Sequence, residues 1–368
     1  MSGRFVSGDF VFVSVRKATS LSSNLAYPGD LIFTQRGTLG QVSIAPDNGF
    51  ERYLISQSQM KVSVNSARHD PLYVFQYFSS HSGQKQITSS AIQTGVPHTN
   101  LGILRGYRFP APPLTEQRAI AEALSDMDAL LDGLARLIAK KRALQQAAMQ
   151  QLLTGQTRLP GFTGEWEVTR LGDLAEIISG GTPSTREPSY WNGGIRWCTP
   201  TDITSNAGKY LTDTERTISR DGLSNSGAVM LPAGALLLCS RATIGEVKIA
   251  AVPICTNQGF KSLVCRAQVN NEFMYYKLLT MKQQMIERAF GSTFLEISTR
   301  NVAALEVVTP AHDEQTAIAT VLSDMDAELQ ALEARRDKTR ALKQAMMQAL
   351  LTGQIRLVPP QAAVSDPP

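Results

Sequence analysis

The sequence predicts an α+β fold: two globular mixed α/β domains separated by two long antiparallel coiled-coil helices, in a tandem repeat with pseudo-twofold symmetry. First, residues 115–159 recur at 313–357, 198 positions later, with 28 of 45 aligned residues identical. Second, both copies carry a coiled-coil pattern of apolar residues. Third, the stretches between the copies also resemble each other. A repeat with so long a period is a duplicated module of domain size, because solenoid units are far shorter.

In both copies of the repeat, apolar residues recur at alternating intervals of four and three, which predicts a coiled-coil seam. Each helix is expected to pack against the other. After a shift the stripe is expected to resume at Leu144, Ala148 and Leu152 in the first copy and at Leu342, Met346 and Leu350 in the second. Gly155 and Gly353 follow the last apolar residues, where a helix commonly ends in a left-handed cap. The residues expected to pack the helix pair are Ile120, Leu124, Met127, Leu131 and Leu134, and Ile318, Leu322, Met325, Leu329 and Leu332.

The repeat divides the chain into five expected parts. They are a first globular domain (1–113), a long helix (114–158), a second globular domain (159–311), a second long helix (312–357) and a proline-rich tail (358–368) that is expected to be disordered. Runs of β-branched and aromatic residues predict strands in the globular domains. These are 10–15, 30–34 and 57–64 in the first domain, and 194–198, 235–239, 246–250 and 260–265 in the second. Helical spacing predicts helices at 70–80 and 271–290.

The two globular domains are related to each other. GDLIFTQRGTLGQV (29–42) aligns with GALLLCSRATIGEV (234–247), and Gly3-Arg4-Phe5 aligns with Gly208-Lys209-Tyr210, an offset of 205. Residues 166–202 therefore have no counterpart ahead of Met1. The first domain is expected to be incomplete at its N-terminal side by about forty residues.

Composition excludes several classes of protein. The four cysteines lie in the second half without CxxC spacing, which disfavours a disulfide framework, and no run of about 20 apolar residues could span a bilayer. A cytoplasmic protein is expected. The net charge is +4, and residues 1–114 hold ten Lys/Arg against five Asp/Glu. That excess suits a nucleic-acid surface, although an ordinary solvated surface explains it equally well.

Catalytic and metal-binding patterns are missing from the sequence. It contains no phosphate-binding GxxxxGK[ST] loop, and its four histidines show no metal-ligand spacing, so no metal site is expected. Asp126 with Asp128, and Asp324 with Asp326, are two positions apart and so do not share a helix face. They are expected to be solvated helix charges. Nothing here supports an enzyme.

The sequence suggests one set of DNA-contacting residues in each globular domain. An arginine after a strand, with a small hydroxyl residue and a glycine, suits contact with phosphate or a guanine edge, an amide can read adenine, and lysine can hold phosphate. The alternative is structural: the arginine pairs with a carboxylate within its domain, and the amides hydrogen-bond across strands. The candidates are Arg36, Thr38, Gly40, Gln57, Ser58, Gln59 and Lys61, and Arg241, Thr243, Gly245, Asn257, Gln258 and Lys261.

Several motifs together resemble the specificity subunit of Type I restriction-modification systems. They are PPLTEQRAIAEALSDMDALL, the paired MQQLLTGQTRL and MQALLTGQIRL, PGDLIFTQRGTLGQVSIAP with ISQSQMK, and WEVTRLGDLAEIISGGTPSTREPSYWNGGIRWCTPTDI. The resemblance covers nearly the whole chain and implies two target-recognition domains alternating with two spacer helices. The incomplete first domain departs from the family pattern.

The resemblance also implies a function. Each recognition domain would read one half of a split double-stranded DNA target, and the helix pair would fix the distance between half-sites. Two N6-adenine methyltransferase subunits and restriction endonuclease/translocase subunits would be its partners. S-adenosylmethionine, Mg²⁺ and ATP would belong to those partners, with no cofactor in this chain. Two other hypotheses stay open: a coiled-coil protein-binding scaffold without a DNA role, and a truncated relic of a specificity subunit. A self-contained enzyme is the least supported.

Overall fold

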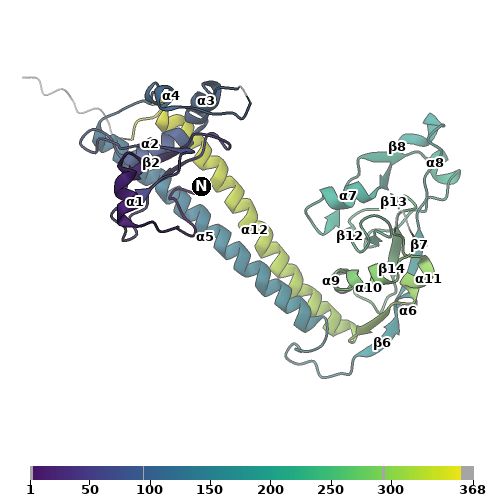
Figure 1. Cartoon of the computed structure of the whole chain (residues 1–368). Helices are drawn as coiled ribbons and strands as arrows, with labels where there is room; N and C mark the ends of the chain where they lie inside the picture. Colours follow the sequence, from purple (N-terminus) through teal and green to yellow (C-terminus); the bar gives the residue numbers. More distant parts are fainter. Residues whose placement is uncertain (1–2, 94, 292–294, 358–368) are drawn as a thin grey trace, which may run out of the picture. The chain divides into compact units, whose positions relative to one another are not determined.

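The computed structural model describes residues 3–93, 95–291 and 295–357 of the chain (Figure 1). Contacts divide it into two compact units. Unit 1 contains the chain up to Ile138 and from Leu332 onward, and unit 2 contains Ala139–Ala331. Each long helix therefore contributes one part to each unit. The tail at 358–368, expected to be disordered, lies outside the described residues.

Unit 1 combines small antiparallel sheets with helices. Strands β2, β3 and β5 form a three-stranded sheet in the order β3-β2-β5, and β1 pairs with β4. The strands are β1 (Leu25–Ala26), β2 (Leu31–Thr34), β3 (Val42–Ile44), β4 (Tyr53–Leu54) and β5 (Gln59–Val62). The helices are α1 (Val15–Ser20), the 3-10 turn η1 (Ser22–Asn24), α2 (Pro71–Ser79), α3 (His81–Ser89) and α4 (Leu101–Arg105), followed by the first part of α5 (Leu114–Leu152).

Helix α2 links the unit 1 sheet to the long helices. Its N-cap Asp70 accepts a hydrogen bond from the amide of Tyr73, and Pro71 stands at the first turn, where a missing amide donor costs nothing. Apolar side chains of the sheet, α2, α5 and the end of α12 (His312–Leu351) then form one core. Its members include Leu31, Phe33, Tyr73, Phe78, Ile120, Leu124, Leu350 and Leu351.

The strand predicted at residues 10–15 is wrong. No regular structure occurs at 10–14, and α1 begins at Val15. Val11 is 91% exposed and Phe12 75% exposed. An apolar, β-branched run becomes a strand only where a neighbouring strand takes up its backbone hydrogen bonds. The described part of unit 1 supplies no such neighbour.

Unit 2 holds a larger sheet of five strands in the order β7-β14-β11-β12-β9. A second sheet has the order β10-β8-β13, and β6 pairs with β15. The strands are β6 (Glu167–Arg170), β7 (Ala175–Ser179), β8 (Trp191–Cys198), β9 (Tyr210–Leu211), β10 (Arg216–Ile218), β11 (Leu236–Leu238), β12 (Val247–Ala250), β13 (Cys255–Thr256), β14 (Lys261–Cys265) and β15 (Glu306–Thr309). The helices are α6 (Leu171–Leu174), η2 (Pro188–Tyr190), α7 (Pro200–Ser205), α8 (Arg220–Ser224), α9 (Asn271–Thr280), α10 (Lys282–Glu287) and α11 (Thr299–Ala303).

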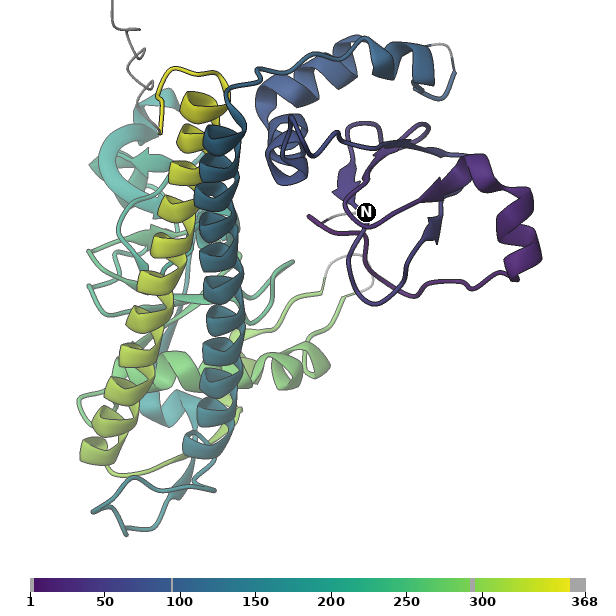
Figure 2. The ribbon, with the colours of Figure 1, turned by 90° about the vertical axis from the view of Figure 1, so that its left-hand side faces the viewer.

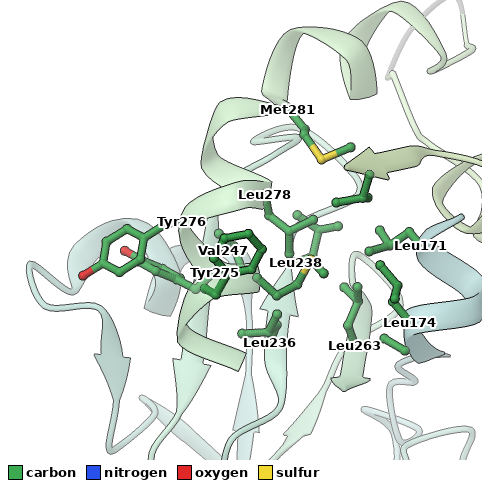
Figure 3. Close-up of a cluster of buried hydrophobic side chains, with 14 of the residues drawn as sticks. Leu171, Leu174, Leu236, Leu238, Val247, Leu263, Tyr275, Tyr276, Leu278 and Met281 are labelled. Atoms are coloured by element: carbon green, nitrogen blue, oxygen red, sulfur yellow. The ribbon is translucent and has the colours of Figure 1, made fainter. Parts of the chain in front are cut away.

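The core of unit 2 lies between the five-stranded sheet and helices α6 and α9. Figure 3 shows Leu236, Leu238 and Leu263 of the sheet facing Leu278 of α9 and Leu171 of α6. The single helix predicted at 271–290 is wrong, because the chain forms α9 and α10 separated at Met281. There the amide of Met281 bonds to Leu278 O, a tightened turn that redirects the chain.

The two long helices are confirmed and run antiparallel to each other. In unit 1, residues 332–351 of α12 lie beside residues 114–138 of α5 (Figure 2), and in unit 2 the remaining parts of the same helices pair. Helix α5 has 39 residues, which gives a length of about 58 Å. It ends at Leu152, six residues before the predicted boundary at 158. Gly155 (φ 73°) and Gly353 (φ 76°) take left-handed conformations just after the two helices.

The predicted seam is buried only in part. Ile120, Leu124 and Leu134, with Ile318, Leu322 and Leu329, are buried, whereas Met127, Leu131, Met325 and Leu332 are half-buried. The resumed stripe is wrong at its first positions, Leu144 and Leu342, which are 48% and 53% exposed, but it is confirmed at its last positions, Leu152 and Leu350, which are buried. Next to the two exposed leucines, Gln145 and Lys343 turn toward the partner helix instead and bond to its carboxylates.

Two Arg–Glu pairs join the start of each long helix to the segment that follows the other. Arg158 donates two hydrogen bonds of 2.6 Å to the Glu314 carboxylate. Arg356 does the same to Glu116, at 2.6 and 2.5 Å. The residues of one pair are 198 positions from their counterparts in the other, so the pseudo-twofold symmetry extends to individual hydrogen bonds. Both glutamate side chains are almost fully buried, and such two-pronged charged bonds are the strong ones.

A second repeated contact fixes the first turn of each long helix. Gln117 accepts a hydrogen bond from the Asp70 amide (3.1 Å) and donates one to Pro112 O (2.7 Å). Gln315 makes the same two bonds, to the Asn270 amide and to Pro310 O, both at 2.9 Å. Each buried glutamine thus ties its long helix to the start of α2 or α9.

The substitution Glu116→Gln should lower the melting temperature at neutral pH by a few degrees, because it removes the charge from a buried pair. The hydrogen bonds from Arg356 hold the pKa of Glu116 below its ordinary value. A carboxyl group with a lowered pKa stabilises the fold above its unfolded pKa, about 4.3, and this stabilisation is lost as the pH falls through the folded pKa. The difference in unfolding free energy between wild type and variant, from urea titrations, should therefore shrink below about pH 4.

Glu122→Gln, at an exposed position of the same helix, serves as the control and should change little. A wild-type-to-variant difference that stayed the same at pH 7 and pH 3 would show that the Glu116 charge contributes nothing to stability.

Candidate nucleic-acid interface

The Arg36 loop, residues 36–40, connects β2 to β3 in unit 1. Arg36 and Thr38 are exposed. Gly40 has φ 91°, which side-chain-bearing residues rarely adopt, and its carbonyl accepts a 2.7 Å bond from the Gln84 side chain. A well-held turn therefore presents two solvent-facing polar side chains.

The Arg241 loop, residues 241–245, occupies the matching place between β11 and β12 of unit 2. Gly245 has φ 86°, and a Cβ there would lie 2.7 Å from Lys282 Cγ, so this position also favours glycine. The two loops share their backbone course. In each unit the start of the loop lies beside the turn that carries the amide candidates. In unit 1 the amide of Gln35 donates a hydrogen bond to Ser58 O (2.7 Å), and in unit 2 the amide of Ser240 donates one to Gly259 O (2.8 Å).

The two loops differ in their electrostatic surroundings. In unit 2, Glu296 pairs with Arg241, with 2.7 Å between Oε2 and Nε, and lies 3.5 Å from the ammonium group of the buried Lys261. This is the structural role that the alternative hypothesis expects of Arg241. The Arg241 side chain nevertheless keeps 43% of its surface exposed.

In unit 1 the position of Glu296 is taken by His98, which bridges to Arg36 through the backbone as Glu296 does to Arg241. Within the described residues, no carboxylate lies within salt-bridge distance of Arg36. The Lys61 ammonium donates a hydrogen bond to Leu25 O and lies 5.6 Å from the centre of the Tyr27 ring. Of the basic candidates in unit 1, Arg36 is thus the one that faces solvent.

The amide candidates make short-range contacts. Gln57 and Ser58 are exposed, and the Gln59 side chain accepts a 3.0 Å bond from the amide of Ser56. In unit 2, Asn257 accepts a 2.8 Å bond from the Gly259 amide, and Gln258 accepts a 2.5 Å bond from Thr182. These are bonds of turns and loops. Thr243, the remaining candidate, is half-buried.

The expectation that the SDMD carboxylates are solvated is wrong for one aspartate of each pair. Asp128 accepts hydrogen bonds from Gln76 of α2 (3.1 Å) and Lys343 of α12 (2.5 Å). Asp326 accepts bonds from Tyr276 of α9 and Gln145 of α5. Each carboxylate therefore ties the helix pair to a globular domain. The available signal was that SDMD lies in a run, LSDMDA (124–129 and 322–327), that is unchanged although the two copies differ at 17 of 45 aligned positions.

Arg216 of unit 2, which stacks on a tryptophan ring, was not predicted from the sequence. The Arg216 guanidinium lies 3.7 Å from the centre of the Trp191 ring and 5.3 Å from that of Trp197. These residues belong to paired strands, β10 and β8. A cation held over an indole face needs both strands in register, which no local pattern reveals.

The described residues contain no group of three or more His, Cys, Asp and Glu side chains that could hold a metal ion. Burial raises the pKa of the Cys239 and Cys255 thiols to about 11 and that of Cys265 to about 12. Thiols with such pKa values stay protonated at neutral pH and are poor nucleophiles. No helix in the described ranges is long and apolar enough to cross a membrane.

The chain is similar to known proteins over most of its length. A family model described as the Type I restriction modification DNA specificity domain matches residues 9–140 and 163–339. The MjaIX type I restriction enzyme specificity subunit of Methanocaldococcus jannaschii is 36% identical over 173 residues, which are 46% of this chain and 40% of that protein. The MjaVIII specificity subunit of the same organism is 24% identical over 323 residues, 83% of this chain and 75% of that protein.

A solved structure shares the fold. The S subunit of a Type I restriction-modification system from M. genitalium superposes with a TM-score of 0.58 at 16% identity, covering 89% of this chain and 83% of that one. At such low identity the likeness concerns the fold alone. The family model, however, matches well over half of the chain in two separate segments. The chain therefore belongs to the family of Type I restriction-modification DNA specificity subunits.

Proposed function

We propose that the chain is a non-catalytic subunit that reads a bipartite double-stranded DNA target and positions N6-adenine methyltransferase and restriction/translocase subunits. The observation that carries the proposal is that the Arg36 loop and the Arg241 loop have the same build and occupy matching places in two related units. Each of these units contains one part of the same helix pair. Two such loops suit two half-sites. S-adenosylmethionine, Mg²⁺ and ATP would then act on the partner subunits.

The exposed Arg36 loop supports direct reading of DNA by unit 1. An arginine can bond to two acceptors on a guanine edge in the major groove, and a free guanidinium is needed for this. In unit 2, Glu296 orients Arg241 while part of the side chain stays exposed. The different partners, His98 and Glu296, would help the two units to prefer different half-site sequences.

The long helices support a role in spacing. In DNA readers with two recognition elements, the separation between half-sites follows from the geometry of the protein frame. Here the frame would be α5 and α12, closed by the Arg–Glu pairs at Glu116 and Glu314. Because the helix repeats keep 28 of 45 aligned residues identical while the globular domains have diverged further, spacing and reading would be separate tasks.

Exposed leucines on α5 support the docking of partner subunits. Leu130 and Leu137 are seven residues apart, so they share a face of the helix, and each is 39% exposed. Exposed apolar side chains that line one face of a helix can form a surface for a partner helix. A helix of a methyltransferase subunit would be a suitable partner.

A protein-binding scaffold without a DNA role is the second candidate, favoured by the Arg241–Glu296 pair. Duplex DNA binding by the assembled complex, measured between about 50 and 200 mM salt, separates the two, because phosphate contacts impose a steep salt dependence. The relic hypothesis draws on residues 11–14 of unit 1, which are exposed and form no strand. It requires that one half-site is not read at all.

Removing seven residues at matching positions of both helices, 133–139 and 331–337, should shorten the gap between half-sites. Seven residues preserve the coiled-coil phase and span about 10 Å, which corresponds to about three base pairs of DNA. Methylome sequencing of cells carrying the variant with its partner subunits should show both half-sequences unchanged. An unaltered gap would refute the role of the helices in spacing.

The substitutions Arg36→Ala and Arg241→Ala should each weaken the reading of a different half-site. Loss of an arginine that bonds to a guanine costs about 1–3 kcal/mol and relaxes specificity at that position. Binding titrations with duplexes mutated in either half, using the assembled complex, measure the effect. Arg136→Ala, an exposed charge on α5, controls for general loss of charge. If Arg241→Ala reduced thermal stability but left both half-sites equally bound, Arg241 would be structural.

A further inference from the structure

Two exposed arginines of unit 2 have no carboxylate within salt-bridge distance among the described residues. Arg186 belongs to the loop of residues 180–187, which connects β7 to η2, and Arg216 begins β10. By contrast, Arg196 of the neighbouring strand β8 pairs with Asp213 (3.2 Å). A guanidinium that the protein leaves without a counter-charge is available to an anion from outside the chain, and its planar fork of donors suits phosphate.

Arg216 is held in place by the two tryptophans of β8. Its guanidinium lies 3.7 Å from the centre of the Trp191 ring and 5.3 Å from that of Trp197. The two rings meet edge to face, with 5.1 Å between their centres, and Trp197 is buried. The attraction between a cation and an indole face restricts the arginine side chain before any ligand arrives. An anion that binds Arg216 therefore meets a largely ordered side chain, and less conformational entropy is lost on binding.

The same tryptophans hold the 180–187 loop. The indole N–H of Trp197 donates a hydrogen bond to Gly181 O (2.9 Å), and that of Trp191 donates one to Ser184 O (3.1 Å). Two carbonyl oxygens, which would repel a phosphate, are thus bonded to the indoles. Three amides of the loop donate no hydrogen bond within the part of the chain that the structure describes, namely those of Thr182, Ser184 and Thr185. Backbone amides are common phosphate ligands in protein–DNA complexes.

The 180–187 loop lies beside the candidate reading residues of unit 2. The Thr182 hydroxyl donates a hydrogen bond to the Gln258 side chain (2.5 Å). The turn that carries Gln258 is bonded to the start of the Arg241 loop, where the amide of Ser240 donates to Gly259 O (2.8 Å). A continuous hydrogen-bonded path therefore connects the two loops. In protein–DNA complexes, contacts to phosphate set the position from which neighbouring side chains reach the bases.

We propose that Arg186, Arg216 and the three unbonded amides of the 180–187 loop form a phosphate-contact site for the DNA backbone beside the half-site read by unit 2. The proposal rests on the proposed function, because it needs a duplex bound at the Arg241 loop. Guanidinium groups and backbone amides are all donors, so the site suits an oxyanion, whereas each base pair presents a donor as well as acceptors in the major groove. The site would supply affinity and register and would carry no sequence information.

An acidic surface of a partner protein is the other ligand that this chemistry suits. The position of the site favours DNA, because the hydrogen-bonded path places it next to the residues proposed to read bases. The two ligands differ in their consequences. Loss of a contact with a partner protein would reduce assembly of the complex, whereas loss of a phosphate contact would reduce DNA binding alone.

The test measures binding of the assembled complex to its duplex target between about 50 and 200 mM salt. Arg186→Gln and Arg216→Gln should each weaken binding by about fivefold and lower the slope of log affinity against log salt by about one, since each removes one phosphate contact. The loss should be the same for duplexes altered in either half-site, and the methylated sequence should not change. Arg196→Gln is the matched control, because its side chain is 38% exposed but already pairs with Asp213, and it should leave the slope unchanged.

Neutral phosphates locate the contact. A methylphosphonate placed singly along the target should weaken binding of the wild-type complex at the contacted phosphate. The same replacement should have no effect on the Arg216→Gln complex, because the two changes remove one interaction. If Arg216→Gln lowers the melting temperature of the free chain, Arg186→Gln tests the site by itself, since Arg186 lies in an exposed loop.

Four results would each overturn the proposal. They are an unchanged salt slope in both arginine variants, an equal change in Arg196→Gln, a loss confined to one base pair of the target, and weaker assembly of the complex with intact DNA binding. In each case a wild-type complex that binds a split target with a steep salt dependence leaves the proposed function standing. A wild-type complex without affinity for duplex DNA would overturn both.

Discussion

The reciprocal joints at the starts of the two long helices are the contacts on which the rest of the structure depends. Each joint combines a buried glutamate held by an arginine from beyond the other helix with a buried glutamine that ties the helix to its globular domain. Leaving one such charge unpaired would cost more than the pair contributes, so all the partners must be kept together. This explains why the EQ and TGQxRL segments are the same in both copies. Each long helix supplies the glutamate of one pair, and the segment after it supplies the arginine of the other, so both copies need the same residues.

The globular domains follow a different rule. Their backbone plan is shared, including the loop with a left-handed glycine that follows β2 in unit 1 and β11 in unit 2. The side chains around that loop differ, with His98 beside Arg36 and Glu296 beside Arg241. A turn held by backbone geometry can keep its shape while its neighbours change.

The sequence predicted the features that depend on local periodicity or on the internal repeat. The long helices, their antiparallel pairing and the strands around Leu31, Leu236 and Leu263 belong to this group. Features that depend on a distant partner were missed. Residues 10–15 carry a strand pattern without a neighbouring strand, and the places expected for Leu144 and Leu342 go to polar residues that reach the facing helix.

In the candidate site, too, features set by a local repeated pattern could be predicted and features that depend on a distant residue could not. The Arg36 and Arg241 loops could be located because two copies of one short pattern exclude chance. The pairing of Arg241 with Glu296 could not be predicted, because 55 residues separate the two and only the folded chain brings them together. The stacking of Arg216 on Trp191 depends in the same way on the register of β10 against β8.

The division of the chain into units also affects the order in which they can fold. Unit 2 is one continuous stretch, whereas unit 1 is built from two stretches that flank it. Domains fold as units while the chain is being synthesised. Unit 2 can complete its core as soon as Ala331 has left the ribosome. Unit 1 must wait for Leu350, Leu351 and Arg356, although most of it is made first. Until then its apolar surfaces stay open, and this is the interval in which it most needs protection from aggregation.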